Sequence, residues 1–127
     1  TPASAVSELL SSSVAPFEVG ALLKQVTNNR DLAHRVLDKL GTQLRDTMDQ
    51  VEAHLAAGSA GEVSKLAHAL KGAAGIVAAF ELMSLAKRME DDARDNNLEK
   101  VRTYWEDFRA ESRRCLAYIP TAQKNLS

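Results

Sequence analysis

The chain has 127 residues, which is the usual length of one domain, and 45% of them are hydrophobic, enough to bury a core. The net charge of -1 argues against a nucleic-acid partner, because phosphate binding needs a clustered basic surplus. No stretch approaches the ~20 apolar residues of a membrane span, so we expect no direct membrane contact. The single cysteine, Cys115, cannot form an internal disulfide and is expected to be a buried, inert thiol in a cytoplasmic protein.

Proline is absent from the middle of the chain, which is rich in Ala, Leu, Lys, Glu and Arg, the composition of an all-helical domain. Residues 1–13 are rich in serine and are expected to be a linker or N-terminal extension with one apolar patch, Val6, Leu9 and Leu10. We place the helical domain at residues 14–120. Pro120 is expected to end the last helix and to leave residues 121–127 as a tail.

The first two predicted helices cover about residues 17–26 and 31–57. Asn28 and Asn29 separate them and offer an N-cap for the second. In that long helix the apolar residues recur in steps of three and four, which predicts one narrow buried seam: Leu37, Leu40, Leu44, Met48, Val51 and Leu55.

Three more helices follow, the first of them over about residues 61–78. Gly58 is expected to be the C-cap of the long helix, and Ser59 with Glu62 forms a capping-box sequence. The next helix carries Leu82, Leu85, Ala86, Met89 and Ala93, and Asn96 is expected to cap the last one. Short joints between single-seam helices predict an all-α, antiparallel up-down four-helix bundle with a short N-terminal helical extension.

His68 lies on the third predicted helix, within the stretch KLAHALKGAAG. A wheel at 100° per residue places it opposite Val63, Leu66 and Leu70, so the imidazole is predicted to be exposed instead of filling the core. Its face of the helix also carries Ser64, Lys65, Gly72, Gly75 and Ala79.

Interior helical glycines such as Gly72 and Gly75 cost about 1 kcal/mol each relative to alanine, so they predict close approach of another surface. A second helix of the bundle would explain them, and so would a partner protein; the wheel favours the partner. Exposed imidazole offers an unprotonated ring nitrogen near neutral pH, and Lys71 can bring an ammonium to any anion on that ring. Together these residues indicate a transient phosphohistidine.

The stretch LAHALKGAAG resembles the motif of histidine-containing phosphotransfer (HPt) domains of bacterial phosphorelays, in which Lys and Gly occupy the third and fourth positions after a histidine. His68, Lys71 and Gly72 match that motif, and FELMSLAKRMED looks like the third core helix of such domains. The resemblance covers roughly residues 15–118. It departs from the family at Ala78, where a glycine is usual, so the following turn is the place where the geometry is in question.

The resemblance implies that His68 accepts a phosphoryl group from a receiver-domain aspartyl phosphate and transfers it to the aspartate of a response regulator. Lys71 would stabilise the phosphate, and Gly72 would leave room for the receiver. Ser64, Lys65, Gly75 and Ala79 would be further partner contacts. The domain would be a carrier, not an enzyme in its own right, without a metal or cofactor of its own, and Mg²⁺ would belong to the receiver.

We further expect a monomer that forms the cytoplasmic C-terminal part of an inner-membrane hybrid sensor kinase, or else a free-standing shuttle. A rival hypothesis is a non-catalytic helical-bundle module that docks a partner through the His68 face. A metal-binding bundle is a second rival, because Asp31 and His34 form one Asp-x-x-His pair. Such centres need a second pair and more carboxylates, which the sequence lacks.

Overall fold

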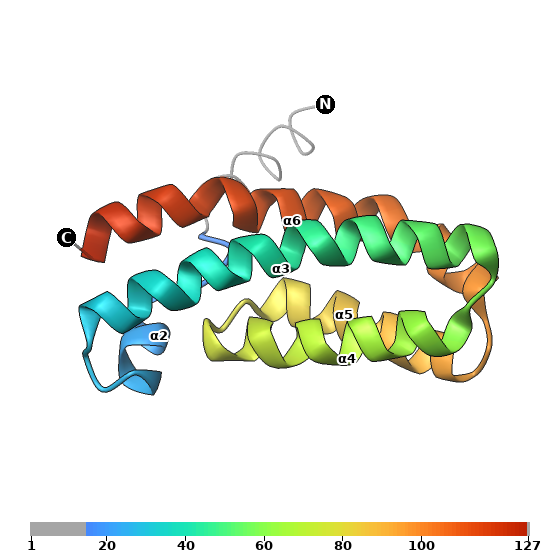
Figure 1. Ribbon diagram of the computed structural model, residues 1–127, viewed down its shortest axis with the longest axis horizontal. Helices are drawn as coiled ribbons and strands as arrows, with labels where there is room; N and C mark the ends of the chain where they lie inside the picture. The colour runs from blue at the N-terminus through green and yellow to red at the C-terminus, as the bar shows by residue number, and fades with distance from the viewer. Residues whose placement is uncertain (1–14, 127) are drawn as a thin grey trace, which may run out of the picture.

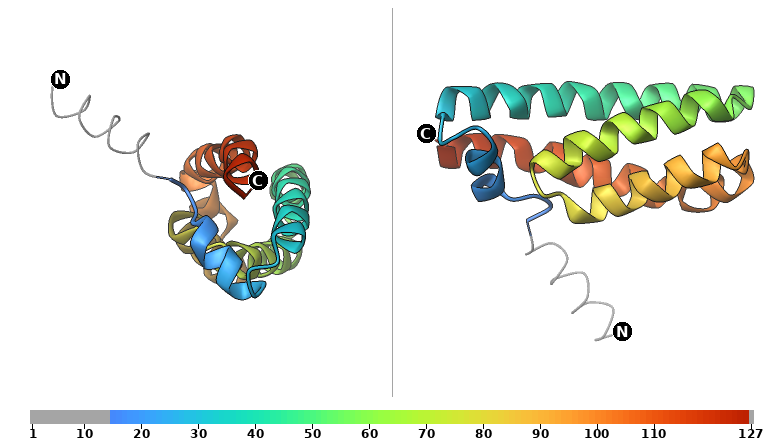
Figure 2. Two further views of the ribbon diagram at one scale, coloured as in Figure 1. Left: turned by 90° about the vertical axis from the view of Figure 1, so that its left-hand side faces the viewer. Right: turned by 90° about the horizontal axis from the view of Figure 1, so that it is seen from below.

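The computed structural model describes residues 15–126, and that range is helical apart from its turns and residues 15–18. A short helix, α2 (Val19–Gln25), precedes four longer ones that run alternately up and down (Figure 1): α3 (Arg30–Ala57), α4 (Ala60–Ile76), α5 (Phe80–Arg94) and α6 (Leu98–Leu126). Seen along the bundle, α3 to α6 surround a common core and α2 lies at one end (Figure 2). The predicted four-helix bundle with a helical extension is therefore confirmed. The predicted linker with Val6, Leu9 and Leu10 falls outside the described residues.

The structure confirms the buried apolar seam that was predicted for the long helix, α3. Five of its side chains are buried and Met48 is half-buried, and each buried leucine contributes about 1.5–3 kcal/mol relative to exposure. Asn29 caps α3, because its Oδ1 accepts the N–H of Leu32 at 3.0 Å. Gly58 ends the helix in the left-handed conformation, at φ 74°.

The turn between α4 and α5 is built around Ala78. The N–H of Ala78 bonds to the carbonyl of Gly75 at 3.2 Å, and the N–H of Ala79 bonds to that of Ala74 at 2.9 Å. This pair of bonds is the Schellman motif, which requires a left-handed residue at the position of Ala78. Ala78 has φ 54°, so it adopts the glycine-type geometry despite its Cβ, at a cost of about 1–2 kcal/mol.

Two capping predictions are wrong in detail. Asn97, not Asn96, caps α6 by accepting the N–H of Lys100 at 3.2 Å. Asn96 is instead the left-handed residue after α5, at φ 58°, a conformation that asparagine tolerates. Ser59 does stand at the N-cap of α4, but its side chain makes no capping hydrogen bond, so the capping box is not formed.

The prediction that Pro120 ends the last helix is also wrong, because α6 continues to Leu126. Proline removes one helical hydrogen bond, but the residues beyond it are held by the bundle. Ala122 and Leu126 are buried, and the Leu126 carbonyl accepts a bond of 2.8 Å from Arg30 Nη1. Residues 121–126 therefore belong to the domain and are not a tail.

The residues just before α2 attach this short N-terminal helix to the rest of the bundle. Phe17 is buried and meets the Tyr118 ring edge-on, with the centroids 5.0 Å apart. The N–H of Glu18 bonds to the carbonyl of Val77 at 2.8 Å, and Leu22 is fully buried. The extension thus covers the end of α4, the helix that carries His68.

Candidate functional site

His68 projects from α4 on the side that faces away from the core. Its side chain is 69% exposed, whereas Val63, Ala67, Leu70 and Ala74 on the same helix are buried. The prediction of an exposed imidazole is confirmed. The exposure of His68 follows from the period of the helix. The neighbouring residues do not predict it, because His68 stands between two alanines.

The imidazole is held by Glu90, a residue of α5 to which the sequence analysis gave no role. Glu90 Oε2 lies 2.6 Å from His68 Nδ1, and its side chain is only 6% exposed. The signal was present in the sequence: Leu82, Ala86 and Glu90 are spaced by four, which aligns the carboxylate with core positions.

Two cations share the same carboxylate. Lys71 Nζ donates to Glu90 Oε1 at 2.7 Å, and Arg94 Nη2 lies 3.1 Å from Oε2. The bond from Lys71 is the main reason why the pKa of Glu90 is lowered, the bond with His68 adds to this effect, and burial opposes both. Glu90 is therefore an ionised acceptor at neutral pH.

An ionised carboxylate at Nδ1 determines the tautomer of the neutral ring. Because a carboxylate only accepts hydrogen bonds, Nδ1 must carry the hydrogen and donate it to Glu90 Oε2. Neutral imidazole has one N–H, so the lone pair is on Nε2. His68 is thus a ring with one nitrogen fixed to the protein and the other available as a nucleophile.

The residues predicted to contact a partner or its phosphate around His68 differ in burial and in their polar contacts within the domain. Lys71 is half-buried and its ammonium is paired with Glu90, so it is close to the ring but not unpaired. The Ser64 hydroxyl donates to the backbone carbonyl of Glu90 at 3.3 Å. Lys65 is exposed and lies 3.6 Å from Glu62.

The two glycines of this face are exposed, as predicted. A Cβ added to Gly72 would have no atom within 4 Å, and one on Gly75 would make ordinary contact with Met83 Cε at 3.6 Å. No helix of the described bundle therefore requires a glycine at position 72. Packing between helices of the bundle therefore does not explain why residue 72 is a glycine.

Ala79 does not belong to this face, and the prediction for it is wrong. It is fully buried, because α4 ends at Ile76 and the left-handed Ala78 redirects the chain before residue 79. Two residues that the sequence analysis missed lie on the surface near this turn: Ile76 is 42% exposed and Phe80 is 67% exposed. Phe80 lies outside the apolar stripe of α5, which was the available signal.

Cys115 and Tyr104 of α6 are both buried in the structure. Cys115 is buried, and burial raises the pKa of its thiol to about 12, as expected of an inert cysteine. Tyr104 is buried, and its hydroxyl donates to Asp92 Oδ2 at 2.7 Å. Residues 15–126 contain no group of His, Cys, Asp and Glu side chains that could hold a metal ion. Within the same range, no helix is long and apolar enough to cross a bilayer.

Comparison with known proteins identifies the family. The model of the Hpt domain family matches residues 35–118. The chain belongs to the Hpt domain family. The crystal structure of histidine-containing phosphotransfer protein B (HptB) from Pseudomonas aeruginosa PAO1 shares the fold, with a TM-score of 0.80 and 20% sequence identity over 89% of this chain and 98% of that one. Among curated protein sequences, none matches.

Membership makes the chain a phosphotransfer carrier of a phosphorelay. Hpt domains are carriers and not classical enzymes, and their partners are receiver domains. The matched residues include His68, Lys71, Gly72 and Glu90, so the site described above lies wholly within the family's domain.

Proposed function

We propose that His68 accepts a phosphoryl group on Nε2 from the aspartyl phosphate of a receiver domain and passes it to the aspartate of a response regulator. The observation that carries this proposal is the 2.6 Å contact between Glu90 and His68 Nδ1 beneath an otherwise exposed ring. It commits Nδ1 to the protein and leaves Nε2 toward solvent, where a second protein can reach it.

In this step the Nε2 lone pair forms a bond to phosphorus while the bond between phosphorus and the aspartate oxygen breaks. The electron pair of the broken bond stays on the receiver's carboxylate, and no proton needs to move. The ring becomes positively charged, with its N–H still directed at Glu90 Oε2. A hydrogen bond between two charged groups is about twice as strong as a neutral one, so Glu90 stabilises the product and the transition state that leads to it.

Lys71 is proposed to neutralise the phosphoryl group. Its ammonium has three donors, of which one is bonded to Glu90, so it can bind phosphate oxygens without leaving the carboxylate. The domain would need no cofactor of its own, and Mg²⁺ would be held by the receiver. Lys71→Ala should slow transfer about tenfold, because it removes about 1.4 kcal/mol of charge stabilisation from the transition state. Lys124→Ala, which removes an exposed lysine near the end of α6, should have a much smaller effect.

The receiver is proposed to dock over Ser64, Lys65, Gly72 and Gly75, beside the exposed Ile76 and Phe80. Large exposed apolar side chains next to a reactive group are typical of a protein-binding surface. The clearance at Gly72, with no atom within 4 Å of a Cβ, fits close approach of the partner's active-site loops.

The test is transfer from a receiver domain labelled with ³²P-phosphate. The expected product is an acid-labile, base-stable phosphoprotein whose ³¹P–¹⁵N coupling identifies Nε2. His68→Gln should abolish it, and His54→Gln, which changes a half-buried histidine of α3, should not. Labelling that survives His68→Gln would overturn the proposal and favour a domain that docks a partner without chemistry at this residue.

The cytoplasmic setting, the hybrid-kinase context and the monomeric state remain predictions. Cell fractionation would test the cytoplasmic setting, the complete reading frame would test the hybrid-kinase context, and light scattering would test the monomeric state.

A further inference from the structure

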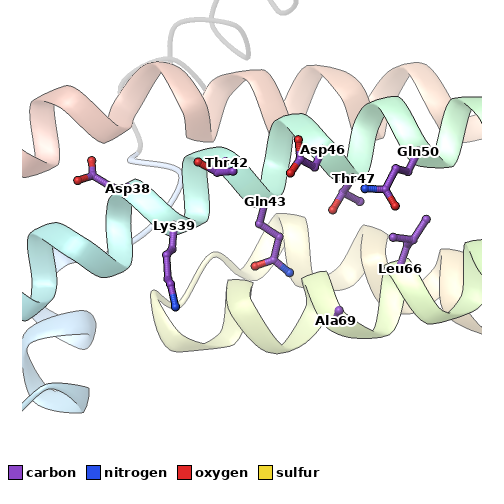
Figure 3. Close-up of a pocket in the computed structure, with 9 residues that line it drawn as sticks. All are labelled: Asp38, Lys39, Thr42, Gln43, Asp46, Thr47, Gln50, Leu66 and Ala69. Carbon is purple, nitrogen blue, oxygen red and sulfur yellow. The ribbon is translucent and has the colours of Figure 1, made fainter.

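A groove of about 600 Å³ runs along the bundle between α3 and α4. Gln43, Thr47 and Gln50 project into it from α3, and Leu66 and Ala69 form its wall on α4 (Figure 3). Steps of four and three align the three polar side chains on one face of α3. A helix face next to a neighbouring helix is normally apolar, so this polar stripe is unusual.

The polar groups of this stripe lack partners. Thr47 is only 4% exposed, yet its hydroxyl makes no hydrogen bond within residues 15–126, and neither do the side chains of Gln43 and Gln50. Asp46, on the rim, forms no ion pair in the part of the chain that the structure describes. Thr47, Gln50 and Asp46 therefore offer a carboxylate and several oxygen acceptors that no other residue of the described bundle uses. The other end of the groove is lined by Lys39 and Asp38 (Figure 3), and Asp38 accepts a hydrogen bond of 2.7 Å from Gln123 Nε2.

The groove is continuous with the His68 surface. Ala69 directly follows His68 on α4, and its side chain is exposed. A protein seated on His68 would therefore extend over this groove on one side of α4, just as it would extend over Glu90 and α5 on the other.

We propose that this groove discriminates between receiver domains by accepting a lysine or arginine side chain of the receiver. Both side chains carry several donors, a positive charge and no acceptor, which matches Asp46, Thr47 and the two amide oxygens. Apolar contacts with Ile76 and Phe80 are not directional and suit many partners. A docked receiver covers these acceptors, and a receiver that leaves them unpaired is disfavoured, so discrimination belongs in the groove. This inference rests on the proposed function.

The test compares a panel of purified receiver domains, phosphorylated with acetyl phosphate, as donors to the wild-type domain and two variants. Thr47→Val removes the hydroxyl without changing the shape, and Asp46→Asn removes the rim charge. For the fastest receiver we expect kcat/KM to fall at least tenfold, with less than a twofold change for the slowest. Thr121→Val and Asp49→Asn, at exposed positions outside the groove, are the matched controls.

A second measurement does not depend on catalysis or on these variants. The side-chain amide signals of Gln43 and Gln50 in ¹⁵N-labelled protein should shift when the fastest receiver is added, while that of Gln25 on α2 stays in place. Unshifted amides, or variants that slow every receiver equally, would overturn the inference. If no receiver phosphorylates the wild type, the proposed function fails; if transfer is normal and only the variants have no effect, the groove inference alone fails.

Discussion

Glu90 Oε2 lies 2.6 Å from His68 Nδ1, and Oε1 of the same carboxylate lies 2.7 Å from Lys71 Nζ. One buried side chain of α5 thus holds both reactive side chains of α4. His68 and Lys71 are three residues apart, so they lie on neighbouring positions of one helix face and can share one acceptor. The reactivity of the motif on α4 therefore depends on a residue in the next helix.

Glu90→Gln should slow phosphoryl transfer to His68 about tenfold. The amide oxygen can still accept the Nδ1–H, but the charge that stabilises the positive ring is lost. The difference between a charged and a neutral hydrogen bond is about 1.4 kcal/mol, or a factor of ten in rate. Single-turnover kinetics with a phosphorylated receiver measure it. Glu62→Gln, on the exposed first turn of α4, is the control, and equal rates for the two variants would rule out a role for the Glu90 charge.

The stabilising effect of Glu90 should disappear in acid. Its pKa is lowered in the folded protein from an ordinary value of 4.5, so the unfolded state binds more protons as the pH falls past that value. The contribution is complete above about pH 4.5 and is lost as the pH falls through the lowered pKa. The Tm of the wild type minus that of Glu90→Gln, followed from pH 7 to pH 2.5, should therefore decrease below pH 4.5. A constant difference would show that Glu90 has an ordinary pKa.

Ala78→Gly should stabilise the domain by about 1 kcal/mol. Ala78 has φ 54°, where a Cβ costs about 1–2 kcal/mol, and the greater entropy of unfolded glycine offsets part of the gain. Urea unfolding measures the change. Ala53→Gly, at an exposed position inside α3, should have the opposite sign, with a loss of about 0.5–1 kcal/mol. Destabilisation by both variants would contradict the left-handed geometry of Ala78.

The helices and the phosphoacceptor could be predicted from the sequence because both depend on local periodicity. The spacing of apolar residues locates each helix, and the same period determines which way His68 points. Glu90 has only a weak signal of this kind, its spacing of four from Ala86 and eight from Leu82. Met89 and Ala93 already complete the apolar seam of α5, and a glutamate beside that seam is normally exposed to solvent. Its burial depends on its contacts with His68 and Lys71 of α4, which is information about two helices at once.

Tertiary packing also explains why the helix ends were less predictable. Pro120 disfavours a helix locally, but burial of Ala122 and Leu126 continues α6 past it. Ala79 was placed on the His68 face by extending the wheel of α4 beyond Ile76, and one left-handed residue invalidates that extension. Local patterns thus identified the reactive face correctly and its far edge incorrectly.

Gly72→Leu should block transfer while leaving the fold at least as stable. Glycine inside a helix costs about 1 kcal/mol relative to good helix formers, and no atom lies within 4 Å of a Cβ at this position, so the bundle can accommodate the side chain. A receiver that approaches His68 closely cannot, and we expect its apparent Kd to rise at least tenfold. Binding by calorimetry and Tm by circular dichroism measure the two effects separately.

Gly20→Leu is the matched control for this variant. Gly20 lies on α2, and a Cβ there also meets no atom within 4 Å, so the substitution tests the same change in size away from His68. It should leave receiver affinity unchanged. If Gly72→Leu binds the receiver as tightly as Gly20→Leu does, the glycine is not clearance for the partner, and the docking surface must lie on another side of His68.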